Sequence, residues 1–203
     1  MSRLAEPGDR EPGFLTPAAK TLFNALKWLS PMAWLDRLRP NATAIELYVL
    51  AGVFLEFIAA INVTKIAGWA SWLQQVVLVL AALKILEIVR VTASSVLFDE
   101  AVVASVQRNF ILAAIGFLEL GLCFGFFYAL NKELLVGDHV GALTGFYLSF
   151  TTQLPIGFGD VAPVGWLRIV AVIQGLNFCF SRIWENCSIA AAASGKTIKQ
   201  FRA

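Results

Sequence analysis

Charged residues are scarce in this sequence of 203 residues. Only 15% of the residues are Asp, Glu, Lys or Arg, whereas 58% are hydrophobic and the mean hydropathy is +0.72. A soluble domain normally carries about 25% charged residues, so the composition excludes an ordinary water-soluble fold. The sequence is typical of a membrane protein.

Residue types that build catalytic and metal sites are also few. There is one histidine, His139, without a companion ligand, and three cysteines without zinc-site spacing: Cys123, Cys179 and Cys187. The cysteines fall in apolar stretches, so the sequence indicates no disulfide framework. Neither a nucleophile with a base and an orienting acid nor a phosphate-binding loop is recognisable. We therefore expect no enzyme, no cofactor and no nucleic-acid partner.

Four apolar stretches have the length of a membrane-crossing helix. About 20 residues are needed to cross a hydrocarbon layer of about 30 Å. The four stretches cover residues 42–63, 69–91, 109–130 and 165–187. A fifth stretch, residues 139–152, is too short to cross and too apolar for an ordinary loop, which predicts a re-entrant helix.

Positive charge flanks the outermost stretches. Lys and Arg precede the first span and follow the last: Arg3, Arg10, Lys20, Lys27, Arg37 and Arg39, and then Lys196, Lys199 and Arg202. Cytoplasmic segments are enriched in these residues. We therefore expect a multi-pass protein of the cell membrane, such as a bacterial inner membrane, with both termini in the cytoplasm.

The remaining segments complete the predicted organisation. Residues 18–41 mix apolar and basic side chains at roughly helical spacing, which predicts an amphipathic helix on the membrane surface, with a loosely ordered linker as the alternative. The predicted units are a disordered N-terminus (1–17), the interfacial helix (18–41), a peripheral two-helix unit (42–92), a cytoplasmic linker (93–108), a module of two spans around the re-entrant helix (109–187) and a short cytoplasmic tail (188–203).

One stretch between the third and fourth spans requires an unusual backbone. In FTTQLPIGFGDVAP, residues 150–163, Gly157 and Gly159 alternate with bulkier residues. Glycine readily takes the positive φ that lets successive carbonyls point the same way. Non-helical backbone at membrane depth is tolerated only inside protein or along a water-filled path. Carbonyls from several copies of such a strand can replace the water around a cation.

This stretch resembles the pore loop of the potassium-channel family, whose signature is T-x-G-[YF]-G-D. The wider segment YLSFTTQLPIGFGDVAP, residues 147–163, is similar to the pore helix, filter and following proline of the bacterial family. The resemblance covers a two-helix pore module, residues 109–187, to which two N-terminal helices are added. It implies an all-α membrane protein with four transmembrane helices, a re-entrant pore helix and a selectivity filter. It also implies a homotetramer, surrounded by lipid, that conducts potassium passively.

The resemblance also implies roles for individual residues. The filter would consist of Pro155, Ile156, Gly157, Phe158 and Gly159, with potassium ions bound at the carbonyls of Ile156, Gly157 and Phe158. Its supporting residues would be Asp160, which hydrogen-bonds toward the pore helix, and Tyr147, Thr151 and Thr152.

Pro155 is a departure from the family pattern, because it stands where the family has the threonine at the inner end of the filter. The substitution removes one hydroxyl ligand from each chain. Two alternatives to a potassium-selective channel follow from it. One is a weakly selective cation channel, and the other is a non-conducting subunit that modifies a partner channel.

The fourth span carries a polar stripe of residues spaced three or four apart: Gln174, Asn177, Ser181, Glu185 and Ser188. Such residues fall near one face of a helix. We interpret the stripe as the lining of a water-filled cavity, with hydrogen bonding between helices as the alternative. Gly175 is a candidate hinge, or else a glycine that allows close helix packing.

Ionisable residues inside the spans need partners, because a charge at a helix centre costs about 2.5–3.5 kcal/mol. The candidate gating charges are Glu56, Lys84, Glu87, Arg90 and Glu119. If the first two spans are antiparallel, Glu56 should pair with Lys84 and Glu46 with Arg90. A reduced voltage sensor made of Lys84 and Arg90 is disfavoured, because Glu87 would cancel much of the movable charge. Glu119 is a candidate for pH-dependent gating, or a structural carboxyl.

Overall fold

A computed structural model describes residue 21 and residues 42–97, 106–137 and 140–179. The predicted N-terminus and cytoplasmic tail lie outside these residues, as does the predicted interfacial helix apart from residue 21. The description therefore covers most of the predicted peripheral unit and pore module.

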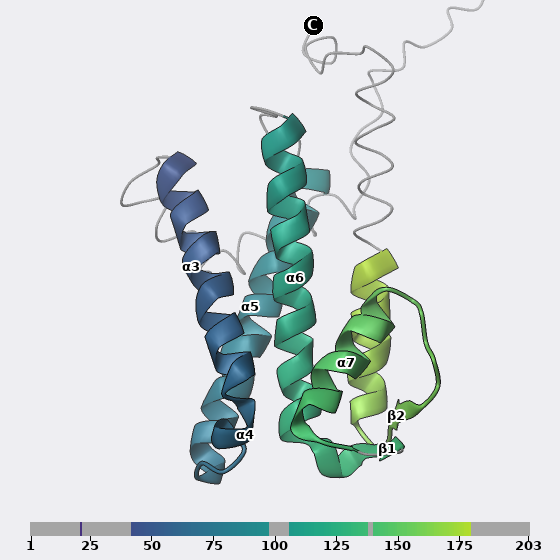
Figure 1. Cartoon of the computed structure of the whole chain (residues 1–203). Coiled ribbons are helices and arrows are strands. Elements are labelled where there is room, and N and C mark those ends of the chain that lie inside the picture. Colours follow the sequence, from purple (N-terminus) through teal and green to yellow (C-terminus); the bar gives the residue numbers. More distant parts are fainter. Residues whose placement is uncertain (1–20, 22–41, 98–105, 138–139, 180–203) are drawn as a thin grey trace, which may run out of the picture.

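The first two predicted spans form a helical hairpin (Figure 1). It consists of α3 (Ala42–Ile61), the short helix α4 (Val63–Ile66) and α5 (Ser71–Leu97). The turn is closed by Gln74, whose Nε2 donates hydrogen bonds to the carbonyls of Ala67 and Trp69, both at 3.0 Å. These bonds satisfy carbonyls that a helix end leaves without an intrahelical partner.

The second half of the chain folds a short helix back against a long one. Its elements are α6 (Val106–Leu130), the 3₁₀ helix η1 (Lys132–Leu134), β1 (Leu135–Gly137), α7 (Ala142–Gln153), β2 (Val161–Pro163) and a helix described from Leu167 to Cys179, called the C-terminal helix below. Helix α7 has only 12 residues and lies beside the lower part of α6 in Figure 1. It has the place and length of the predicted re-entrant helix.

Two predictions need correction: the residue bounds of the linker, and the expectation that the fold contains only helices. Helix α5 continues to Leu97 and α6 begins at Val106, so both helices extend into the predicted linker, which contains neither proline nor glycine to stop them. In addition, β1 and β2 pair antiparallel, with Leu135 opposite Pro163 and Gly137 opposite Val161. The two connections flanking α7 and its loop run side by side there and satisfy each other's backbone groups.

Two described helices are long and apolar enough to cross a membrane: Ser71–Val91 within α5 and Ile111–Leu130 within α6. By length and composition, these are two candidate membrane spans among the described residues. Helix α3 has the predicted position and 20 residues. That α3 and the C-terminal helix also cross the membrane stays a prediction.

Helix α6 lies between the α3–α5 hairpin on one side and α7 with the C-terminal helix on the other (Figure 1). On one side, Leu122 and Phe126 join a buried apolar cluster with residues of the hairpin, such as Val63 and Leu78. On the other side, Phe124 and Tyr128 join a second cluster with residues such as Leu148, Val161 and Leu167. The hairpin and the elements that follow α6 are therefore both packed on this helix.

Glycines allow α7 to approach α6 closely. A Cβ atom at Gly145 of α7 would overlap the backbone of Ala129 in α6, and one at Gly125 of α6 would overlap the ring of Phe146. The Phe146 ring meets that of Phe126 edge-on, with 5.3 Å between the ring centroids. The close packing of α7 against α6 thus depends on glycine at residues 125 and 145.

Replacing Gly145 by Ala is expected to lower the free energy of unfolding by about 1–3 kcal/mol, because α7 must move away from α6 to admit the methyl group. The apparent melting temperature of the purified protein in detergent measures this loss. Gly175→Ala is the matched control, since Gly175 is also helical but a Cβ there meets no atom within 4 Å. Equal melting temperatures for the two variants would contradict the close packing of α7.

Candidate functional site

The loop that follows α7 has the backbone predicted for a carbonyl-lined strand. Gly157 has a φ of +52° and Gly159 a φ of +78°, in the left-handed region that favours glycine. A Cβ atom at either position would meet nothing within 4 Å. In the isolated chain, these glycines are therefore required by backbone conformation and not by lack of space.

In this loop, backbone amides form hydrogen bonds with α7, whereas the carbonyls do not. The amides of Ile156 and Gly157 donate to the carbonyl of Thr151, at 3.0 and 3.4 Å, which ties the start of the loop to the end of α7. Within the part of the chain that the structure describes, no hydrogen bond is accepted by the carbonyls of residues 156–159. Their oxygens are available to another ligand.

Two predicted supporting residues meet at the far end of the loop. The hydroxyl of Tyr147 donates to the Asp160 carboxylate, with 2.9 and 3.0 Å to the two oxygens, and the Tyr147 ring stacks on Phe158 at 6.3 Å between centroids. Helix α7 thus holds both ends of the loop.

The predicted threonines take different places. The Thr151 hydroxyl donates within its own helix, to the carbonyls of Tyr147 and Leu148 at 3.0 and 3.1 Å, and only the Thr151 backbone contacts the loop. Thr152 is half-buried, and Pro155 is exposed in the isolated chain.

The prediction that Gln174 lines a water-filled cavity was wrong. Its side chain is 1% exposed, so it does not line a cavity. Its Nε2 donates to the Ser149 carbonyl and hydroxyl, both at 2.9 Å, and its Oε1 accepts from the Tyr128 hydroxyl at 3.0 Å. The alternative of hydrogen bonding between helices is therefore confirmed for this residue. The physical reason is that Gln174 faces α6 and α7, whose buried polar groups need partners.

Sequence reasoning missed the partners of Gln174. Ser149 also donates to the Gly121 carbonyl at 2.7 Å, and Gln153 donates to the Phe117 carbonyl at 2.7 Å, so both fix α7 to α6. Their spacing of four residues places them on one face of a helix, which is the signal that could have identified them.

The other predicted cavity residues are only partly described. Asn177 is half-buried, whereas Ser181, Glu185 and Ser188 lie outside the described residues. A Cβ atom at Gly175 would meet nothing within 4 Å, so Gly175 is not needed for close packing within this chain. The hinge stays a prediction.

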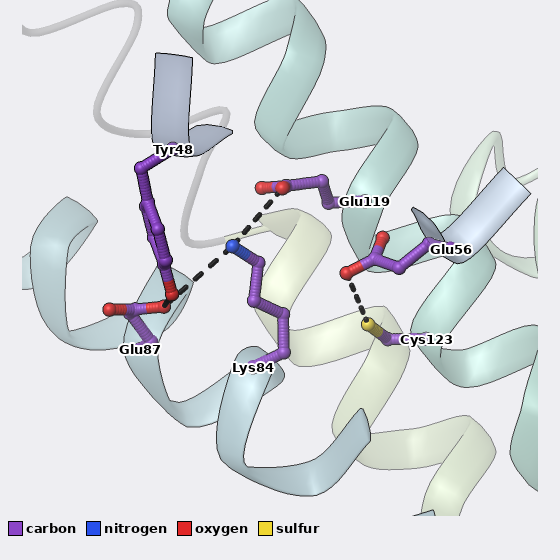
Figure 2. A network of polar contacts seen from close by, with 6 residues as sticks. All are labelled: Tyr48, Glu56, Lys84, Glu87, Glu119 and Cys123. Carbon is purple, nitrogen blue, oxygen red and sulfur yellow. Dashed lines mark hydrogen bonds and ion pairs between the residues drawn. The ribbon is translucent and has the colours of Figure 1, made fainter. Parts of the chain in front are cut away.

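Three candidate gating charges, Lys84, Glu87 and Glu119, form a network at the interface of α3, α5 and α6 (Figure 2). Lys84 Nζ lies 3.2 Å from Glu119 Oε1 and 3.7 Å from Glu87 Oε2. It also lies over the Tyr48 ring, 4.7 Å from its centroid, and the Tyr48 hydroxyl donates to Glu87 at 2.8 Å. Lys84 thus joins the hairpin to α6 by a buried ion pair.

The predicted pairing of Lys84 with Glu56 was wrong, because a closer carboxylate is provided by α6. Glu56 instead accepts a hydrogen bond from the Cys123 thiol at 3.6 Å (Figure 2). Gly52 makes room for the ion pair, since a Cβ there would lie 3.1 Å from Glu119 Oε1. The pairing of Glu46 with Arg90 stays a prediction.

A short helix turned back between two longer ones, followed by a glycine loop with free carbonyls, is the arrangement typical of pore-loop membrane proteins. Residues 112–184 match the family model described as "Ion channel". This segment is similar to an ion-channel domain. Ion channels are transport proteins, so the expectation of no enzyme is confirmed for this segment. The match begins within α6 and does not include the α3–α5 hairpin. No curated protein and no solved structure matched the chain.

Replacing Gln174 by Leu is expected to lower the free energy of unfolding by about 1–3 kcal/mol for each buried group left without a partner, the Tyr128 hydroxyl among them. Thermal unfolding in detergent measures the effect. Gln75→Leu, at an exposed position of α5, makes the same chemical change without loss of buried bonds. If Gln174→Leu altered ion flux and left stability unchanged, the buried position would be incorrect.

Replacing Lys84 by Met is expected to cost about 3–5 kcal/mol of stability, because Glu119 and Glu87 lose a buried cation. The double variant Lys84→Met, Glu119→Met should recover the part of that loss that comes from Glu119, since two apolar side chains pack in place of the pair. Melting temperatures of both variants test this order, with exposed Lys65→Met as the control. A Lys84→Met protein as stable as Lys65→Met would contradict the ion pair.

Proposed function

We propose that this protein is a passive cation channel, selective for potassium, that conducts through the loop 155–159 at the centre of a homotetramer. The observation that carries the proposal is the set of free carbonyls at residues 156–159, on a backbone bent by positive φ at Gly157 and Gly159. A row of carbonyl oxygens without hydrogen bonds offers a dehydrated cation the ligands that replace its water.

The need for several copies follows from the exposure of this loop. Ile156 is 49% and Phe158 is 68% exposed in the isolated chain. Irregular backbone at membrane depth must be buried in protein or line a water-filled path, because lipid satisfies no backbone group. One chain provides only one row of oxygens. Four copies around an axis would bury the loops against each other and surround the ion.

Helix α7 supports cation binding through its direction. It ends at Gln153, directly before the loop, and the carbonyl end of a helix carries partial negative charge. No acidic side chain lies within residues 154–159, so attraction for the cation comes from backbone and helix dipoles. Carbonyls are hard oxygen ligands without titratable groups, which suits conduction that is independent of pH at the filter.

A second candidate is a weakly selective cation channel, and Pro155 is the observation that favours it. Proline offers a carbonyl but no hydroxyl, so the innermost ion site has one ligand fewer from each chain than the resemblance implies. A third candidate is a non-conducting subunit of a partner channel. It shares the fold of the pore module and differs only in the absence of flux from the protein alone.

The test is the reversal potential of the purified full-length protein in planar bilayers, with potassium and sodium present on both sides in opposing gradients. We expect reversal near the potassium equilibrium potential. Pro155→Thr should move it further in that direction by restoring the hydroxyl. Gly157→Ala should abolish the current, because a side chain disfavours a φ of +52°.

Other outcomes of this experiment would favour one of the two alternative functions or overturn the proposal. Reversal near zero, shifted toward potassium by Pro155→Thr, would favour the weakly selective channel. Absence of current from correctly assembled protein, across voltages and pH values, would favour the non-conducting subunit. A current that persists unchanged in Gly157→Ala would place conduction outside this loop and overturn the proposal.

A further inference from the structure

The last turn of α7 is held by two buried side-chain amides. Gln153 ends the helix and is 2% exposed, and it lies against the equally buried Gln174 of the C-terminal helix. Gln153 Nε2 donates to the Phe117 carbonyl of α6 at 2.7 Å, and Gln153 Oε1 accepts from Gln174 Nε2 at 3.4 Å. One side chain therefore ties the end of α7 to both of its neighbouring helices.

The backbone directly after this turn has few ties of its own. Pro155 has no amide hydrogen to donate, and its side chain is exposed in the isolated chain. The amides of Ile156 and Gly157 share one acceptor, the Thr151 carbonyl, which belongs to the same last turn of α7. The place where the loop starts is therefore decided by the position of that turn, which Gln153 fixes.

Side-chain amides can hold this turn without disturbing a cation in the loop. A buried donor or acceptor that loses its partner costs free energy, so the two bonds of Gln153 resist a displacement of the turn. An amide is neutral, and both polar groups of the Gln153 side chain are already occupied by protein partners. The side chain thus acts on the position of the loop and not as a ligand of the ion.

We propose that Gln153 is a positioning residue for the loop 155–159, and that its bonds to Phe117 and Gln174 set the distance of this loop from the axis of the tetramer. The inference rests on the proposed function, because the axis and the ion path belong to it. In a ring of four chains, a displacement of every loop away from the axis widens the opening by twice that displacement. The carbonyls then surround a potassium ion less closely, and discrimination between potassium and sodium falls.

Ser149 provides a matched control, because it makes a similar bond one turn earlier in α7. Its hydroxyl donates to the Gly121 carbonyl of α6 at 2.7 Å, the same length as the bond from Gln153 to Phe117. Both side chains are buried. Ser149→Ala therefore removes a buried bond between α7 and α6 but leaves both bonds of Gln153 in place. A purely structural role predicts the same result for Ser149→Ala as for a Gln153 variant.

Two measurements on the full-length protein, in lipid nanodiscs and in planar bilayers, test the proposal. Hydrogen exchange, followed by mass spectrometry of the peptide that contains Ile156 and Gly157, reports how firmly the start of the loop is held. The reversal potential under opposing potassium and sodium gradients reports selectivity. Gln153→Met keeps the length of the side chain and removes both polar groups. We expect about tenfold faster exchange in this variant and a reversal potential nearer to zero, whereas Ser149→Ala should match the wild type in both.

A second variant keeps the test decisive if Gln153→Met fails to fold. Gln153→Asn retains the amide but shortens its reach by one methylene, so it should shift both readouts in the same direction. Equal readouts for the Gln153 variants and Ser149→Ala would overturn the proposal. Faster exchange with an unchanged reversal potential, in a background where the wild type is selective, would overturn it as well.

Failure of the proposed function gives a different result from failure of this inference. A wild-type protein without a selective current would contradict the proposed function, and hydrogen exchange alone would then decide whether Gln153 positions the loop. Faster exchange in Gln153→Met than in Ser149→Ala would support that role, whereas equal exchange would exclude it.

Discussion

Backbone carbonyls without hydrogen-bond partners are the constraint on which the rest of this structure depends. A membrane interior provides no donor for them, so a loop that exposes them must be held rigidly and covered by protein. The neighbouring elements serve this requirement in different ways. The Thr151 carbonyl binds the start of the loop, the Tyr147 hydroxyl binds Asp160 after it, and the β1–β2 pairing fixes its exit. The Gln174 network then fixes α7 itself to its two neighbours.

Helix α6 connects this loop to the rest of the chain because it is used on two faces. Toward α7, glycine at residue 125 and at residue 145 of the partner helix permits contact at backbone distance. Toward α3 and α5, Glu119 provides the partner for Lys84. A displacement of the hairpin relative to α6 would separate a buried ion pair, which is costly. The hairpin is thus mechanically joined to the ion-channel domain and is not a loosely attached anchor.

The same ion pair changes the interpretation of the charged residues in the hairpin. Lys84 is shared between two carboxylates and the Tyr48 ring, so in this structure it holds α3, α5 and α6 together. Among the described residues, Glu56 then accepts its hydrogen bond from the Cys123 thiol. One interaction therefore explains both how the hairpin is fixed to α6 and why Glu56 pairs elsewhere.

The sequence by itself determined the features that depend on local chemistry. Apolar length predicts the positions of α3, α5, α6 and α7, and alternating glycines predict the positive φ of the loop, because both follow from the residues in place. Tertiary structure alone decided which way the polar side chains face. Helices that are apolar on all sides carry no stripe that marks a buried face, so the partner of Lys84 and the orientation of Gln174 could not be predicted from spacing. Both were decided by which neighbouring helix offered a buried group that needed a partner.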